Sequence, residues 1–326
     1  MSTEREVILE ARDVTKVFRT MKGRSLLAND RVNLKVYRGE TLGIAGESGC
    51  GKSTFIKMAT MLDTPTEGQI LFRGQDVSKL HGEALRSVRR HIQMVFQDPG
   101  DAFSPRMKVK NILCEPLLNF GLISRGEVTK RAQELLEMVE LPPDFAERYA
   151  KDMSGGQRQR VGIARALALE PDLLVCDEVT SALDVSVQKR IVDLLLRLQK
   201  EKNITMIFIC HDIALVRAMA HRTAVMYLGN VVEVVPGRQL GAEPCHPYTK
   251  ALREAIFDLT MDFAKPIESI DSEAPSPLDL PPGCPFGDRC GRCSELCRRE
   301  KPALRKIGPG HEIACHLFRD LPEATE

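Results

Sequence analysis

Apolar and polar residues change their spacing several times along the chain, and each change predicts a different element. Residues 5–45 alternate short apolar and polar segments, a pattern that predicts an antiparallel β region. Short apolar runs predict buried strands at residues 41–45, 69–72, 92–96, 173–177 and 205–210. Helical spacing of the apolar residues predicts helices at about 53–62, 156–169 and 187–200.

The segment from about residue 98 to 155 has a different pattern. Apolar residues at helical spacing predict two helices there, at 109–120 and 125–139. On either side of this segment, apolar strands alternate with amphipathic helices, which predicts a mainly parallel sheet covered on both faces. The expected fold class is therefore α/β, with an antiparallel β subdomain and a helical insertion. After Pro236 the composition changes, which predicts a smaller C-terminal extension.

Composition and charge limit the possible functions. The chain has 326 residues, enough for a full α/β core and a smaller second module. Its 46 basic and 45 acidic residues leave a net charge of +1, which argues against a nucleic-acid partner. No apolar stretch approaches the roughly 18 residues that cross a bilayer, and the charged start lacks the apolar core of a signal peptide. We therefore expect a soluble, cytoplasmic protein in which any membrane role needs a membrane-embedded partner.

A glycine-rich loop follows the apolar run at 41–45. It has the pattern G-x4-G-K-S-T and consists of Gly46, Glu47, Ser48, Gly49, Cys50, Gly51, Lys52, Ser53 and Thr54. The glycines let the backbone turn tightly and aim its N–H groups at phosphates, and the following helix adds its positive N-terminal end. Lys52 would reach the β and γ phosphates of ATP, and the Ser53 hydroxyl would hold Mg²⁺. The loop predicts a P-loop NTPase core, and an ordinary glycine-rich turn is the weaker alternative.

Two carboxylates close the apolar run at 173–177. Asp177 would lie at the C-terminal edge of a buried strand, where α/β sheets bind ligands, and could orient Mg²⁺ through its water shell. Glu178 is adjacent and suits polarisation of the attacking water as a general base. Alone, such a pair could be a strand-terminating acidic turn. A phosphate loop in the same chain makes a hydrolytic site the stronger interpretation.

The segment SGGQ, residues 154–157, lies between these two motifs. Its serine can cap the helix that follows, and its two glycines leave the N-terminus of that helix open to an approaching anion. The next turn is basic, with Arg158 and Arg160, which also suits phosphate binding. An ordinary capped helix is the alternative.

The phosphate loop, the SGGQ segment and the strand that ends in Asp177-Glu178, in this order, resemble the ATP-binding-cassette ATPases. In that family the SGGQ segment of one subunit closes over ATP held by another. Residues 181–184 match the family's loop that communicates across the dimer. The resemblance implies that the chain is inactive as an isolated monomer. It also implies contacts to the partner's ATP from Ser154, Gly155, Gly156, Gln157 and Asp184.

The resemblance also implies roles for three residues outside these motifs. Gln97 and His211 each follow an apolar strand, so both would project toward the same edge of the sheet. In the family, the glutamine contacts Mg²⁺ and the attacking water, and the histidine contacts the γ-phosphate. Phe18 occupies the place where the family stacks an aromatic ring on adenine, although a core position would suit this phenylalanine almost as well.

The C-terminal part resembles the extension of dipeptide and oligopeptide importer ATPases. The resemblance rests on the His-Pro-Tyr-Thr segment at 246–249, a Pro-rich stretch and a cysteine cluster. It implies an ABC nucleotide-binding domain at 1–235, with the helical subdomain at about 98–155. Residues 236–326 would form the C-terminal extension.

For importers of this kind, the family implies an ATPase at the cytoplasmic face of the cell membrane. Its partners would be a second, often non-identical ATPase subunit, two transmembrane permeases and, indirectly, an extracytoplasmic substrate-binding protein. Di- and oligopeptides are the expected solutes, with nickel, glutathione or another small solute as the alternative. A soluble, non-transport cassette ATPase is the rival from another class. Such proteins usually carry two cassettes or a long coiled-coil insertion, and this chain has neither.

Half of the ten cysteines lie in the last part of the chain, after residue 283. Four of them follow the spacing C-x5-C-x6-C-x17-C: Cys284, Cys290, Cys297 and Cys315. Four thiolates suit either Zn²⁺ or an iron–sulfur cluster, and Cys293 could replace one ligand. The spacing resembles the tail of peptide-importer ATPases in which a [4Fe–4S] cluster is found. We therefore expect a structural [4Fe–4S] cluster first, Zn²⁺ second and free thiols third.

Overall fold

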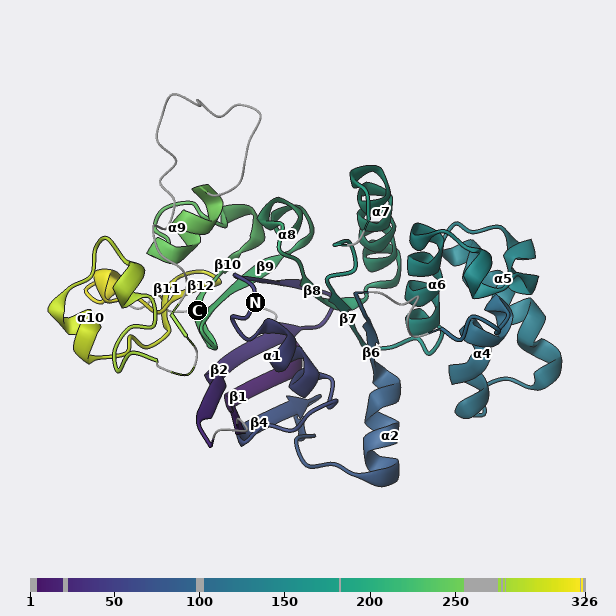
Figure 1. The fold of residues 1–326 in the computed structure, drawn as a ribbon, viewed down its shortest axis with the longest axis horizontal. Helices are drawn as coiled ribbons and strands as arrows, with labels where there is room; N and C mark the ends of the chain where they lie inside the picture. Colours follow the sequence, from purple (N-terminus) through teal and green to yellow (C-terminus); the bar gives the residue numbers. More distant parts are fainter. Residues whose placement is uncertain are drawn as a thin grey trace. The chain divides into compact units, whose positions relative to one another are not determined.

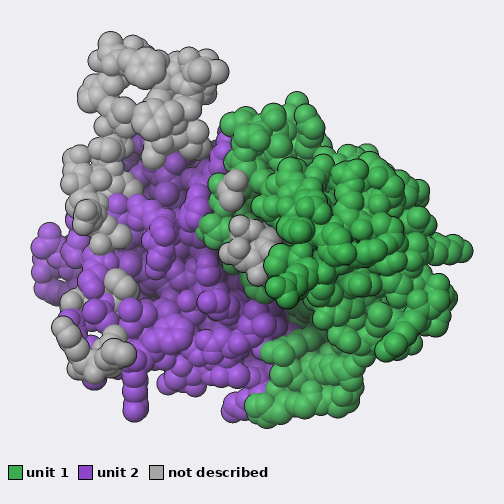
Figure 2. All heavy atoms as spheres, turned by 45° about the vertical axis from the view of Figure 1, so that its right-hand side comes forward, with its two compact units in different colours: residues 1–8, 37–39, 80–207 green, residues 9–36, 40–79, 208–326 purple. Residues whose placement is uncertain are grey.

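The computed structural model describes residues 5–19, 23–97, 103–181, 183–254, 275–276, 278, 280–322 and 324. Figure 1 labels its helices and strands. The chain divides into two units, each of which is discontinuous in the sequence (Figure 2). The first unit consists of residues 1–8, 37–39 and 80–207, and the second unit consists of residues 9–36, 40–79 and 208–326.

A four-stranded sheet in the order β2-β1-β4-β5 lies almost entirely in the second unit (Figure 1). Its strands are β1 (Val7–Arg19), β2 (Ser25–Tyr37), β4 (Glu67–Phe72) and β5 (Gln75–Asp76). β1 and β4 are antiparallel, with Leu9 opposite Phe72 and Ala11 opposite Ile70. These four side chains are buried, as expected where residues two apart share one face of a sheet. The predicted antiparallel β region is confirmed.

The other strands of the second unit join a strand from the N-terminal part of the chain to strands from its C-terminal part. β3 (Thr41–Ala45) runs parallel to β9 (Arg222–Tyr227), and β9 pairs antiparallel with β10 (Asn230–Pro236). Beyond β10 the sheet continues through β12 (His311–Ile313) to β11 (Arg305–Gly308), and each pair is antiparallel. The C-terminal extension therefore adds strands to the sheet that contains β3. The sequence patterns above do not predict β9 to β12.

A buried carboxylate on β10 contacts the C-terminal extension. Glu233 is fully buried, and its Oε1 lies 2.8 Å from His311 Nε2 on β12. Its Oε2 accepts a hydrogen bond of 3.2 Å from the backbone N–H of His246. Because an uncompensated buried charge is costly, Glu233 depends on these two partners for its burial.

The helices of the second unit are short and flank these strands. They are α1 (Lys52–Ala59), α8 (Ile213–Met219), α9 (Pro247–Glu254) and α10 (Glu295–Arg299), with 3₁₀ turns at Gly237–Gln239, Gly287–Arg289 and His316–Phe318. α8 packs against β3, where Gly43 allows close contact. A Cβ atom on Gly43 would lie 2.5 Å from Val216 Cγ1. The predicted helix at 53–62 corresponds to α1.

A buried ion pair joins the start of β9 to the turn before β3. Arg222 Nη1 donates to Glu40 Oε1 at 3.0 Å, and the two side chains are only 9% and 7% exposed. We expect Arg222→Met to lower the free energy of unfolding by about 3–5 kcal/mol, because it removes the ion-pair partner of a buried carboxylate. Urea unfolding followed by circular dichroism measures this loss. Arg12→Met, at a half-exposed ion pair in the same unit, is the control and should change stability by less than about 1 kcal/mol.

In the first unit, two parallel strands form the frame. β6 (Ile92–Val95) pairs with β7 (Leu173–Asp177), with Ile92 opposite Leu173 and Val95 opposite Cys176. The first four residues of β7 are fully buried, as their apolar run predicted. β6 follows directly on α2 (Gly82–His91), a helix that the sequence patterns above do not predict. β8 (Thr205–Ile209) begins in the first unit and is buried along its whole length.

Helices make up the rest of the first unit. α4 and α5 lie in the predicted helical insertion at about 98–155 and pack against each other and against α6, which corresponds to the helix predicted at about 156–169 (Figure 1). The helices are α4 (Val109–Asn119), α5 (Val128–Met138), α6 (Gly155–Leu167) and α7 (Val185–Lys202), with 3₁₀ turns at Arg125–Glu127, Pro143–Glu147 and Ala150–Asp152. In the part of the chain that the structure describes, no helix has both the length and the apolar character to cross a membrane.

Candidate functional site

The phosphate loop lies in the second unit, between β3 and α1. Its glycines adopt backbone conformations that other residues rarely take: φ is +149° at Gly46, +76° at Gly49 and +103° at Gly51. A Cβ atom would lie 2.3 Å from the carbonyl oxygen of Met226 at Gly46, and 2.4 Å from that of Ala28 at Gly51. The loop is therefore held closely against neighbouring backbone, which side chains at these two positions would prevent.

Lys52 is the first residue of α1 and is 4% exposed. Its Nζ donates to the carbonyl oxygens of Gly46 at 2.7 Å and Glu47 at 2.8 Å. The ammonium group thus lies inside the loop, where phosphate oxygens could replace the carbonyls as its partners. Cys50 is also buried, and this burial raises the pKa of its thiol, so it remains protonated and unreactive at neutral pH.

The remaining predicted nucleotide contacts of the second unit are Ser53, Phe18 and His211. Ser53, in the first turn of α1, is exposed and available to a metal ion. Phe18, near the end of β1, is 41% exposed, and Lys16 Nζ lies 5.1 Å from its ring centroid. Phe18 is therefore not part of the hydrophobic core, which was the alternative to a contact with adenine. His211 is exposed and directly precedes Asp212, which caps α8 by accepting from the N–H groups of Ala214 and Leu215.

In the first unit, three predicted site residues follow two paired strands. Gln97 comes two residues after Val95, and Asp177 and Glu178 follow Cys176, which lies opposite Val95. Because β6 and β7 are parallel, these polar groups are at the same end of the strand pair. Glu178 has a positive φ of 50°, and its carbonyl oxygen accepts from the hydroxyl of Ser181 at 2.9 Å. The backbone turn after β7 is thereby fixed at the proposed catalytic carboxylate.

The SGGQ segment begins α6. Ser154 caps the helix, as predicted: its Oγ accepts from the backbone N–H of Gln157, and the Gln157 side chain accepts from the backbone N–H of Ser154 at 2.9 Å. A Cβ atom on Gly156 would lie 2.6 Å from Val187 Cγ1 of α7, so this glycine lets the two helices approach each other. Gly155 is exposed at the helix start.

The two arginines of the following turn are engaged within the first unit. Arg158 Nη1 donates to the carbonyl oxygen of Met153 at 2.8 Å, and Arg160 Nη1 donates to that of Val139 at 3.1 Å. Asp184 caps α7 by accepting from the backbone N–H of Val187 at 3.0 Å. The hydroxyl of Ser186 donates to the same carboxylate, which lowers the pKa of Asp184.

The four predicted metal-binding cysteines come together in the extension. Cys284, Cys290, Cys297 and Cys315 line one small cavity, and Cys293 does not line it. Burial raises the pKa of Cys290, that of Cys315 to about 11 and that of Cys284 to about 12. Throughout the described residues, no three His, Cys, Asp or Glu side chains are grouped to hold a single metal ion. All ten cysteines of the chain are free thiols in the structure.

Two residues beside the phosphate loop are not predicted by any motif. Tyr248 and Arg289, both in the C-terminal extension, contact Glu47 of the loop. Tyr248 lies in the His-Pro-Tyr-Thr segment at 246–249, which stands out only through its family resemblance. Arg289 lies 242 positions from Glu47, and no local pattern marks it.

Two family models match the chain. The ABC transporter family matches residues 29–181, and the oligopeptide/dipeptide transporter C-terminal region matches residues 232–297.

Several proteins are similar over most of their length. The oligopeptide transport ATP-binding protein AppF of Bacillus subtilis is 44% identical, with 97% of this chain and 99% of that protein covered. The probable peptide ABC transporter ATP-binding protein y4tS of Sinorhizobium fredii is 47% identical, with 89% and 82% covered. Among solved structures, the ATP-binding cassette MJ0796, a dimer bound to ADP and Pi after hydrolysis, is 35% identical with a TM-score of 0.65. That match covers 71% of this chain and 99% of the cassette.

Proposed function

This chain belongs to the ABC transporter family, and from that premise we propose that it powers the import of di- and oligopeptides across the cell membrane. It is an ATPase subunit of the kind that energises a membrane importer. The observation that carries the peptide assignment is the match of residues 232–297 to the oligopeptide/dipeptide transporter C-terminal region. We assign residues 1–235 to the nucleotide-binding domain, with its helical subdomain at about 98–155, and 236–326 to the extension.

ATP binds to the phosphate loop in this proposal. The loop N–H groups and Lys52 hold the β and γ phosphates, and Phe18 stacks on adenine. The buried ammonium group of Lys52 and the exposed ring of Phe18 support these two roles. Ser53, Gln97 and Asp177 would hold Mg²⁺, because their side chains carry the oxygen ligands that this ion prefers.

Hydrolysis proceeds by attack of a water molecule on the γ-phosphate. Glu178 polarises this water and accepts its proton, Gln97 helps to orient it, and His211 contacts the γ-phosphate. The bond between the γ-phosphorus and the bridging oxygen breaks, which leaves ADP and inorganic phosphate. The common end of β6 and β7 supports a joint role for Gln97 and Glu178.

A second cassette completes each ATP site. Its SGGQ segment and the residue equivalent to Asp184 approach the ATP held by this chain, and the corresponding residues here serve the partner. ATP binding closes the two cassettes, and hydrolysis reopens them, which drives alternating access in two transmembrane permeases. We propose a non-identical partner cassette, a position at the cytoplasmic face and an extracytoplasmic binding protein that delivers the solute. A small solute such as nickel or glutathione is the alternative cargo.

Purification from native membranes, combined with uptake measurements, tests this function. We expect the chain to co-purify with two permeases and a second cassette, and its deletion to abolish uptake of a labelled tetrapeptide. Lost uptake of nickel or glutathione with normal peptide uptake would show that the peptide assignment is wrong. Recovery without membrane subunits, bound instead to nucleic acid or ribosomes, would favour a soluble cassette ATPase.

We also propose that Cys284, Cys290, Cys297 and Cys315 hold a [4Fe–4S] cluster, with Zn²⁺ as the second choice. The shared cavity supports a common ligand for the four thiols. Burial raises the pKa of Cys284, Cys290 and Cys315, so these three thiols are protonated without a metal, and metal loading would release their protons. A bound cluster or zinc ion would cross-link the four cysteine side chains within the extension.

Anaerobic purification tests the cysteine assignment. We expect a brown protein with iron and acid-labile sulfide, and we expect Cys290→Ser to lose the colour and to unfold at a lower temperature. Cys293→Ser, outside the cavity, is the matched control and should keep its iron. A colourless, zinc-loaded wild type would exclude the cluster.

A further inference from the structure

Glu47, the second residue of the phosphate loop, is held by two side chains of the C-terminal extension. Arg289 Nη1 donates to Glu47 Oε2 at 2.8 Å, and Nη2 donates to Oε1 at 3.1 Å. This is the paired, two-bond geometry that makes arginine–carboxylate contacts strong and directional. The hydroxyl oxygen of Tyr248 accepts from the backbone N–H of Glu47 at 2.8 Å. The side chain and the N–H group of one loop residue are therefore both fixed by the extension.

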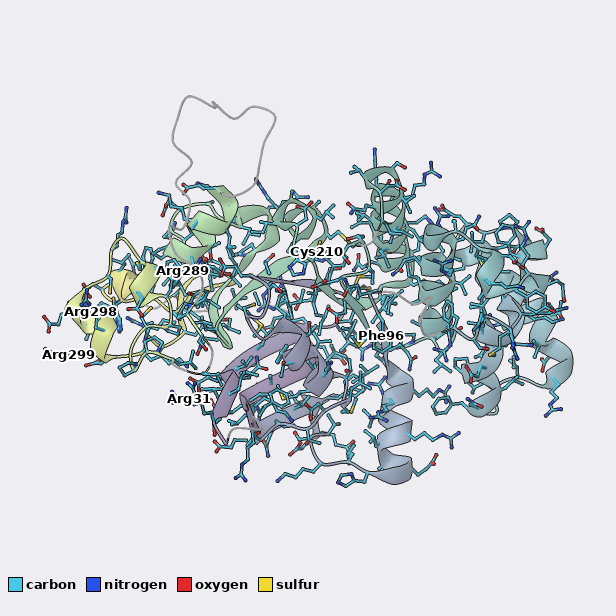
Figure 3. The ribbon with its side chains drawn as sticks, viewed as in Figure 1. Arg31, Phe96, Cys210, Arg289, Arg298 and Arg299 are labelled. Atoms are coloured by element: carbon cyan, nitrogen blue, oxygen red, sulfur yellow. The ribbon has the colours of Figure 1, made fainter. Side chains whose placement is uncertain are left out.

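Arg289 is itself held in place by packing. Its side chain is 6% exposed, its Nη1 also donates to the hydroxyl oxygen of Tyr227 at 3.3 Å, and its guanidinium lies 5.7 Å from the Tyr227 ring centroid. Tyr227, on β9, contacts the rings of Tyr248 and Phe286, with centroids 4.6 Å and 5.3 Å away. In Figure 3, Arg289 lies beside the strands of the second unit, whereas Arg298 and Arg299 lie at its outer edge. The Arg289 side chain is therefore buried and fixed by its neighbours.

The carbonyl group of Glu47 connects this contact to Lys52. This carbonyl oxygen accepts from Lys52 Nζ at 2.8 Å. Glu47, which the extension contacts, therefore also positions the lysine that would bind phosphate. A rigid loop loses less conformational entropy when it binds its ligand. A shift of Glu47 would move both the loop backbone and the lysine anchor.

We propose that the C-terminal extension sets the ATP affinity of the phosphate loop, with Arg289 and Tyr248 as positioning residues that act through Glu47. This inference rests on the proposed ATP site. It gives the extension a part in the nucleotide cycle, in addition to its role as a structural tail. The alternative is that the ion pair only stabilises the fold.

Titration of ATP into the full-length chain by calorimetry tests the proposal. We expect Arg289→Gln to weaken ATP binding about ten-fold, in line with the loss of a charge-assisted, two-bond contact. Tyr248→Phe keeps the ring packing and should weaken binding about three-fold. Arg289→Lys keeps the charge without the paired geometry and should recover part of the affinity. Arg299→Gln, an exposed arginine of the same segment, is the matched control and should bind ATP as the wild type does.

A double variant and a kinetic measurement distinguish an effect of Arg289 on ATP binding from an effect on the stability of the fold. Glu47→Gln combined with Arg289→Gln should bind ATP no more weakly than either single variant, because both remove one interaction. In the assembled transporter, Arg289→Gln should raise KM for ATP and leave kcat within about two-fold. A purely structural role predicts a lower melting temperature with unchanged ATP affinity.

The outcomes distinguish this inference from the site on which it rests. If the wild type binds no ATP, or if Lys52→Ala binds as the wild type does, the proposed ATP site is wrong and the inference falls with it. If the wild type binds ATP and both Arg289→Gln and Tyr248→Phe bind equally well, the inference alone is overturned. Should Arg289→Gln fail to fold, the result for Tyr248→Phe decides.

Discussion

We expect Glu178→Gln to bind ATP normally and to hydrolyse it about 10²- to 10⁴-fold more slowly, which is the usual contribution of a general base. Glutamine has the shape of glutamate but cannot accept the proton of the attacking water. Glu178 has a positive φ, and glutamate and glutamine should adopt this backbone conformation equally well. The variant should therefore fold normally and stop the cycle after ATP binding.

The trapped state can be measured directly. Gel filtration of the variant with its partner cassette and Mg²⁺–ATP should show a closed dimer that does not dissociate, while the wild type returns to monomers. Glu137→Gln, an exposed carboxylate on α5 of the same unit, is the control and should hydrolyse ATP at the wild-type rate. Wild-type hydrolysis in Glu178→Gln would mean that another group is the base.

We expect Lys52→Ala to lower ATP affinity by about 100-fold, which corresponds to the loss of one or two charge-assisted hydrogen bonds of roughly 1.5–3 kcal/mol each. The side chain is buried against the loop, and its ammonium group donates to two loop carbonyl oxygens. Its removal takes away the buried positive charge of the loop and leaves those carbonyl groups without this partner. Both effects act on the loop that would receive the phosphates.

Calorimetric titration with ATP gives the affinity of this variant. Lys57→Ala removes an exposed lysine from the same helix and should leave the affinity unchanged. A melting temperature close to that of the wild type would show that Lys52→Ala acts on binding. Unchanged affinity in Lys52→Ala would contradict the assignment of the phosphate loop.

Strands that are buried on both faces could be predicted well from the sequence. The runs at 173–177 and 205–210 match β7 and β8 to within one residue, because burial of a whole strand requires an almost unbroken apolar run. The run at 92–96 matches β6 as closely, although Gln93 and Met94 are only half-buried. α7 was also predicted, although it extends two residues further at each end. Asp184 caps its start, and Asn203 ends it in a left-handed conformation.

Elements stabilised by their neighbours could not be predicted in the same way. α2 has no buried residue, and its apolar residues Ala84, Leu85 and Val88 give only a short apolar stripe. β10 is a run of β-branched residues that Glu233 interrupts. This glutamate contacts the backbone N–H of His246, 13 positions away, and the ring of His311, 78 positions away. β11 and β12 are short: β12 pairs with β10, and β11 pairs with β12.

The site residues also fall into two groups, those that a local sequence pattern marks and those that depend on distant contacts. The phosphate loop could be predicted because its glycines, lysine and serine are contiguous and each meets a local requirement of the backbone or the ligand. The spacing of the four cysteines predicted a shared site, and they line one cavity, but their binding of a metal stays a prediction. Arg289 could not, because its role depends on a partner 242 positions away and on a ring cluster assembled from three segments.

The strands of the extension also bear on how this protein reaches its folded state in the cell. β10 would be the edge of its sheet without β12, and it would expose unpaired N–H and C=O groups together with the Glu233 carboxylate. Exposed sheet edges invite pairing with other chains. During synthesis β10 leaves the ribosome well before β12 exists, so the nascent chain passes through a stage that is open to aggregation. A chain truncated after Pro236 would lack β12 and keep β10 as an exposed edge strand.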